Sequence, residues 1–260
     1  MPVLAWILLA CLAGGVISVL LAALVAFRLQ ARLVPVLVSY AVGALLGAVF
    51  LDILPHLFEQ TVDYGGTAAV ILAGLLGFFV LEKVLLWRHH HHHGEADEAP
   101  AAHGHDHDHG RSGLLIVVGD SFHNFTDGIL IAAAFLADVK LGIVTAAAIV
   151  AHEVPQEVGD FLVLLHSGYS RARALAMNAM SSLANVAGAL LGYFALSVAE
   201  AWVPTVLALA AASMLYVADA DLIPGLHRRS RPGESLLQVA FIGLGIASLW
   251  AVHAVLGHAH

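Results

Sequence analysis

The sequence predicts an all-α, polytopic membrane protein with eight transmembrane helices. Hydrophobic residues make up 60% of the 260 residues and charged residues only 12%, whereas soluble domains have about 45–50% and about 25%. The hydrophobic residues fall into runs of about 20, which is the length that a helix needs to cross ~30 Å of hydrocarbon. The basic residues gather in alternate connections between these runs, as is typical of membrane proteins.

The predicted spans follow one another with short connections, apart from one long polar segment. Each contains glycine or alanine, and such small residues let helices approach closely in lipid, where no hydrophobic force drives them together. The spans are residues 3–27, 32–57, 65–88, 114–136, 140–166, 170–198, 202–223 and 235–257.

The basic residues predict the orientation of the protein. Every Lys and Arg except Lys140 lies at one end of the predicted spans. Because basic residues stay in the cytoplasm, we expect this end to be cytoplasmic and both termini to point outward. The expected location is the cell (inner) membrane, with the chain as a multi-pass protein. The residues at this end are Arg28, Arg32, Lys83, Arg88, Arg111, Arg171, Arg173, Arg228, Arg229 and Arg231.

Residues 89–113 form a polar, low-complexity segment that holds nine of the 17 histidines. It divides the chain into spans one to three (residues 1–88), a His-rich cytoplasmic loop (89–113) and spans four to eight (114–260). Imidazoles and carboxylates at this density bind ions such as Zn²⁺ weakly and in many arrangements. The loop is therefore expected to buffer or sense metal, or to be an inert solvated linker.

A repeated tetrapeptide indicates internal symmetry. Span two ends in Asp52-Ile53-Leu54-Pro55, and span seven ends in Asp221-Leu222-Ile223-Pro224. In the predicted topology the first copy lies at the outer face and the second at the inner face. This is the pattern of inverted repeats in secondary transporters, here arranged around the central pair of spans four and five.

Spans four and five carry an unusual set of polar residues near their middles. Span four reads D-S-F-H-N-F-T-D-G from Asp120. His123 and Asp127 are four residues apart and share one helix face, and Asn124 lies about 100° round the helix. Ionisable residues at this depth are costly and usually face a cavity or a partner.

Span five reads H-E-V-P-Q-E-V-G-D from His152. His152 and Gln156 share one face, and Glu153 and Glu157 share the next. Because the two helices run antiparallel, the histidines of both spans arrive at similar depth. Two imidazoles, several carboxylates and two amides suit Zn²⁺, and by ligand type also Fe²⁺, Mn²⁺ or Cd²⁺. The alternative is a polar network that only holds two helices together, which would need far fewer ionisable groups.

These two motifs resemble those of the Zrt-/Irt-like (ZIP) family of divalent metal transporters, in particular the subfamily with H-N-x-x-D and H-E-x-P-H-E-x-G-D. The eight spans, the outward termini and the His-rich loop after span three also match. The resemblance implies transport of metal into the cytoplasm. It places a primary metal position at His123, Asp127, His152 and Gln156, and an adjacent second position at Asn124 and Glu153, with Glu157 supporting the ligands.

One residue departs from the subfamily pattern, since Gln156 stands where its second motif has histidine. Because an amide is a poorer zinc ligand than an imidazole, we expect one tightly held ion in the membrane core. For a ligand from the sixth span, Ser181, Ser182 and Asn185 remain open.

Polar residues outside the two motifs are less specific. Asp52 and His56 suit an outer waiting site or an interfacial pair in contact with water, and Asp219 and Asp221 suit the lining of an exit. The remaining histidines outside the loop are expected to be surface side chains: His166, His227, His253, His258 and His260.

Several other classes of protein fit less well. The net charge of −8 argues against a nucleic-acid partner, and the single Cys11 excludes an internal disulfide. A membrane zinc protease needs H-E-x-x-H, so we expect no enzyme and no resident cofactor. The alternative function is a metal/proton exporter of the cation diffusion facilitator kind, but that family has six spans and a soluble C-terminal domain. The expected partners are divalent metal ions and the bilayer, with a homodimer as the oligomeric state to test.

Overall fold

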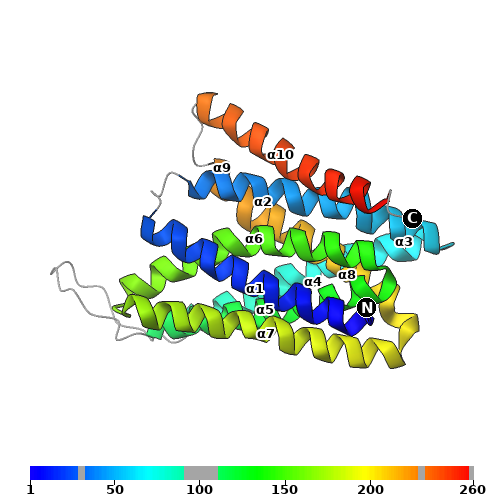
Figure 1. Ribbon diagram of the computed structural model, residues 1–260, viewed down its shortest axis with the longest axis horizontal. Coiled ribbons are helices and arrows are strands. Elements are labelled where there is room, and N and C mark those ends of the chain that lie inside the picture. The colour runs from blue at the N-terminus through cyan, green and yellow to red at the C-terminus, as the bar shows by residue number, and fades with distance from the viewer. Residues whose placement is uncertain (29–32, 91–110, 228–231, 258–260) are drawn as a thin grey trace.

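The computed structural model describes residues 1–28, 33–90, 111–227 and 232–257 of the chain, and these residues form helices joined by short connections (Figure 1). The prediction of an all-α fold is confirmed. The elements are α1 (Val3–Arg28), α2 (Val34–Ala48), η1 (Val49–Ile53), α3 (Leu54–Gln60), α4 (Tyr64–His90), α5 (Arg111–Ala137), α6 (Val139–His166), α7 (Arg171–Val198), η2 (Glu200–Trp202), α8 (Val203–Tyr216), η3 (Val217–Leu222), α9 (Ile223–His227) and α10 (Pro232–Gly257).

The described elements make eight helical passes, since α2, η1 and α3 form one continuous helix and so do η2, α8, η3 and α9. Their bounds agree with the predicted spans to within a few residues. Six passes are long and apolar enough to cross a membrane. The other two, α5 and α6, are just as long at 27 and 28 residues, but they carry the polar motifs. Residues 91–110 of the predicted loop lie outside the described part of the chain.

The passes alternate in direction along the bundle. In Figure 1, α1 begins and α10 ends at the right-hand end, and α4 ends and α5 begins at the left-hand end. We call these the termini end and the loop end. This arrangement matches the predicted topology, in which both termini lie on one side and the basic connections lie on the other.

Helix packing follows an inverted repeat around α5 and α6. In the first three passes, α1 packs on α6, and α2 packs on both α10 and α6. In the last three passes, α7 packs on α5, and α8 packs on both α4 and α5. The first three passes therefore repeat their contacts in the last three, with the roles of α5 and α6 exchanged.

A π-helical turn interrupts both copies of the repeated tetrapeptide. Asp52 lies in η1 and Asp221 lies in η3, and Pro55 and Pro224 follow at the start of the next helical segment. A proline has no N–H to donate to the carbonyl four residues earlier, so the local helical hydrogen bonds are altered at this point. π-Turns are frequent at functional sites.

Two helix pairs touch through their backbones at glycines. A Cβ on Gly128 of α5 would overlap the backbone of Asn185 in α7, and a Cβ on Gly188 of α7 would overlap that of Phe125. Gly43 and Gly245 bring α2 and α10 together in the same way. Without a hydrophobic force between helices in lipid, such close packing is what holds them.

Gly188→Ala is expected to destabilise the protein, because the new methyl group meets the backbone of Phe125, which cannot turn aside as a side chain can. Overpacking of this kind costs roughly 1–3 kcal/mol. Gly243→Ala in α10 is the matched control, since a Cβ there meets no atom within 4 Å. Thermal unfolding in detergent measures both variants, and equal midpoints for the two would contradict the prediction.

The two halves of the bundle differ in polarity. The main apolar core fills the half near the termini end, where Ile7 and Cys11 of α1 pack with residues 131–135 of α5 and with Leu141 and Ile149 of α6. A cavity of about 440 Å³ lies in the other half. The cavity that His123 shares with Asp120, Gln156 and Asp160 therefore lies on the loop side of the middle of α5 and α6.

Candidate metal centre

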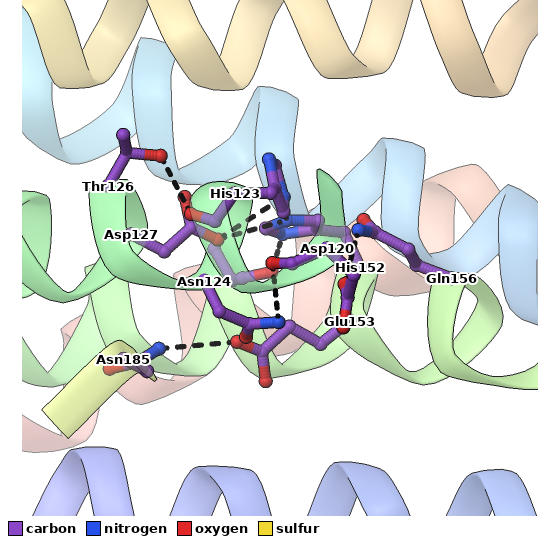
Figure 2. Close-up of polar contacts among 10 residues, drawn as sticks. Asp120, His123, Asn124, Thr126, Asp127, His152, Glu153, Gln156 and Asn185 are labelled. Carbon is purple, nitrogen blue, oxygen red and sulfur yellow. Dashed lines mark hydrogen bonds and ion pairs between the residues drawn. The ribbon is translucent and has the colours of Figure 1, made fainter. Parts of the chain in front are cut away.

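Three predicted ligands converge between α5 and α6 (Figure 2). His123 and Asp127 lie one turn apart on α5, with Nε2 of His123 3.5 Å from Oδ2 of Asp127. His152 of α6 points across at both: its Nε2 is 3.3 Å from Oδ2 of Asp127 and 3.1 Å from Nε2 of His123. We call these residues the His-Asp-His cluster.

The spacing of the three atoms suits a single metal ion. Ligands that hold Zn²⁺ in a tetrahedron at about 2.0–2.1 Å lie about 3.3–3.4 Å from one another. The three observed separations are 3.1, 3.3 and 3.5 Å. Two nitrogens and one oxygen are therefore placed as three corners of such a tetrahedron, and one corner is left for a further ligand.

The surroundings prepare the cluster for a cation. Asp127 is 2% exposed and His152 is 2% exposed, and His123 is partly exposed toward the cavity. Nδ1 of His152 lies 3.4 Å from the carbonyl of Ala148, which favours the proton on Nδ1 and leaves the Nε2 lone pair for a metal. The cluster is the one group of three or more His, Cys, Asp or Glu side chains with metal-binding spacing among the described residues.

Gln156 lines the same cavity as His123 and is hydrogen-bonded to Asp120. Its Nε2 donates to Oδ1 of Asp120, 3.0 Å away (Figure 2). The resemblance implied a role beside His152 in the primary position, which stays a prediction. The hydrogen bond to Asp120 connects α6 to α5 one turn nearer the loop end.

The residues of the implied second position are held by other groups. Asn124 donates from Nδ2 to the backbone carbonyl of Asp120, 3.1 Å away, and its buried Oδ1 has no hydrogen-bond partner. Oε1 of Glu153 accepts from Nδ2 of Asn185, 3.3 Å away (Figure 2). Among the three sixth-span alternatives, Asn185 bonds to Glu153 and Ser182 bonds to Glu157.

Glu157 connects α6 to α7. Its Oε1 accepts from Ser182 Oγ at 2.8 Å, and its backbone carbonyl accepts from Asn178 Nδ2 at 3.1 Å. It is 1% exposed and anchors the helix that carries His152.

Two carboxylates at the site escaped the sequence analysis, although both belong to the quoted motifs. Asp120 precedes His123 by three residues, and Asp160 follows Gln156 by four. Both line the cavity with His123 and Gln156. Their helical spacing from the predicted ligands was the signal that could have found them.

The polar residues outside the motifs lie apart from the cluster. Asp52 in η1 is 7% exposed and bonds to the ring of His253 in α10, which is itself exposed at the surface as expected. His56 bonds to Gln60 at 2.9 Å. Asp219, His166 and His227 are exposed.

Comparison with known proteins gives the same family that the two motifs resemble. A family model described as ZIP Zinc transporter matches residues 87–253. Zinc transporter ZIP13 of Danio rerio is 28% identical over 83% of this chain and 75% of its own length. Zinc transporter ZIP13 of Pongo abelii is 31% identical over 81% of this chain and 64% of its own length. Zinc transporter ZIP4 of Homo sapiens is 39% identical over 53% of this chain, which is 21% of its length.

Proposed function

The chain belongs to the ZIP zinc transporter family, and from this premise we propose that it carries divalent metal ions, Zn²⁺ foremost, across a membrane by way of the His-Asp-His cluster. Family membership and the six apolar helices make it an integral multi-pass membrane protein. The relatives are named as transporters, which fits a protein that is not an enzyme and sets aside an exporter of the cation diffusion facilitator kind.

The observation that carries the proposal is the geometry of the cluster. Nitrogen and oxygen atoms from His123, Asp127 and His152 stand at the edge lengths of a metal tetrahedron, near the middle of two helices that lie inside the bundle. A cargo site at this depth can be reached from either side in turn, which is what alternating access requires.

The direction that we propose is into the cytoplasm. The cavity beside His123 lies in the half of the bundle near the loop end, and the apolar core fills the other half. Basic residues at the loop end favour a cytoplasmic position for it. In this conformation the cluster would release its ion to the cytoplasm, and a second conformation would open the termini end.

Uptake into vesicles tests the proposal. The purified protein, reconstituted in liposomes that contain a zinc-sensitive dye, is expected to raise the internal Zn²⁺ signal many-fold faster than protein-free liposomes do. Cd²⁺, Fe²⁺ and Mn²⁺ are added in turn as competitors to rank the ions. A signal equal to that of protein-free liposomes for every ion would refute the proposed function.

A further inference from the structure

A polar path leads from the His-Asp-His cluster toward the loop end. The cavity of about 440 Å³ is lined on its polar side by Asp120, His123, Gln156 and Asp160 and on its apolar side by residues such as Val38 and Leu222. His123 thus belongs to the cluster and to the cavity at once.

Both carboxylates of the cavity lie nearer the loop end than the cluster. Asp120 precedes His123 on α5, which begins at the loop end, and Asp160 follows Gln156 on α6, which ends there. Since the helices are antiparallel, both displacements run in the same direction. Asp120 lies about one helical turn, or roughly 5 Å, beyond His123, and Asp160 lies about two turns, or roughly 12 Å, beyond His152. An ion that leaves the cluster toward the loop end therefore passes between two acids.

The negative charge of these acids is poorly matched. Asp120 is 7% exposed, its Oδ1 accepts from Gln156, and Ser181 also lies within hydrogen-bonding range of its carboxylate. Oδ2 of Asp120 and Oδ2 of Asp160 are both buried without a hydrogen-bond partner. The two carboxylates are close enough to act on each other, and no ion pair of the described residues includes either.

A buried carboxylate oxygen without a partner is costly in a medium of low dielectric constant. Two such oxygens on facing helices, in a cavity wide enough for an ion and water, would be stabilised most directly by a cation. Carboxylate and amide oxygens are ligands for divalent metals, but for Zn²⁺ they are weaker than a set that contains imidazole.

We propose that Asp120 and Asp160 form a second cation site, on the loop side of the His-Asp-His cluster, which takes a divalent metal ion through oxygen ligands. The proposal rests on the proposed function and adds a step to it. The ion moves from two nitrogens and one oxygen to an all-oxygen site, where it is held less tightly and exchanges its ligands for water more readily. The second site thus lowers the barrier to release.

Asp160→Asn tests this site, because it removes the charge and keeps the shape. Zn²⁺ binding to the full chain is measured by equilibrium dialysis with elemental analysis, and each variant is compared with the parent so that the contribution of the His-rich segment cancels. The variant is expected to bind about one weakly held ion fewer than the parent and to retain the tightly held one. The kcat of its Zn²⁺ uptake in liposomes should fall several-fold with little change in KM. Asp160→Glu should restore both the number of bound ions and the kcat of uptake.

Two further variants separate this proposal from the proposed function. Glu200→Gln removes an exposed carboxylate at the other end of the bundle and should bind as many ions as the parent. His152→Ala should lose the tight ion and keep the one that depends on Asp160. If Asp160→Asn binds as many ions as the parent with the same affinities, the second site is refuted, whatever His152→Ala does. If His152→Ala loses no ion, the cluster is refuted instead.

Discussion

His152→Ala is expected to reduce metal uptake to the level of protein-free liposomes. The substitution removes one of the two nitrogens of the His-Asp-His cluster and leaves two protein ligands, His123 and Asp127. Loss of a group that merely orients a ligand already costs 10–100-fold in metal affinity, so loss of the ligand itself should cost at least about 100-fold. The initial rate of Zn²⁺ uptake and the affinity for Zn²⁺ in detergent are the two measurements.

The variant is expected to fold, because Asp127 keeps His123 as a partner 3.5 Å away and the cavity beside the cluster can supply water. His152→Gln, which preserves volume and polarity, guards against a packing effect and should lose uptake as well. His166→Ala is the matched control: it removes a histidine from the same helix at an exposed position and should transport like the parent. Full uptake by a folded His152→Ala protein would show that the ion does not pass through the cluster.

Gln156→Glu is expected to raise the number of Zn²⁺ ions that the core retains at equilibrium and to slow their release. The sequence gives one reason, which is that an amide is a poor zinc ligand, and the structure gives a second. In the parent, the amide of Gln156 donates to Asp120 and so partly offsets its charge. A carboxylate there would donate nothing and would place a third acid beside Asp120 and Asp160, which makes a strongly cation-attracting cavity.

Bound zinc in Gln156→Glu is measured against the parent by elemental analysis after dialysis, and uptake is followed in the same preparations. Gln156→Leu separates the two effects of the change, since it also loses the hydrogen bond to Asp120 but adds no charge, and it should not gain an ion. In the parent we expect one tight ion, because Glu153 and Asn124 are already engaged with Asn185 and with the backbone of Asp120. A second tightly bound core ion in the parent would contradict this interpretation of Gln156.

Much of the fold could be predicted because it depends on local properties of the chain. The length of each hydrophobic run determines whether it can span a bilayer, and the observed helices begin and end within a few residues of the predicted ones. The tetrapeptides at Asp52 and Asp221 indicated the inverted repeat, which the packing of α1 on α6 and of α7 on α5 confirms. Spacing of four residues on one helix likewise put His123 and Asp127 on a common face.

The partners of the site residues could not be predicted in the same way. Both His253 and Asp52 are visible in the sequence, yet 201 residues separate them and only the packing of α10 on α2 joins their side chains. The sequence likewise could not show that Asn185 bonds to Glu153 and Ser182 to Glu157, because these contacts follow from how α6 and α7 pack. For Asp120 and Asp160, the motif spacing was present, but a common cavity follows only from how α5 and α6 face each other.

The sequence by itself determined which segments are helices, how they alternate in direction and which two of them carry the predicted metal ligands, because hydrophobic length and helical spacing are properties of a single segment. The tertiary structure decided which ligands meet. The rotation of α5, α6 and α7 about their axes turns Gln156 to Asp120 and leaves His123, Asp127 and His152 together. The backbones of α5 and α7 touch at Gly128 and Gly188, and a contact between distant backbones leaves no pattern in either segment alone.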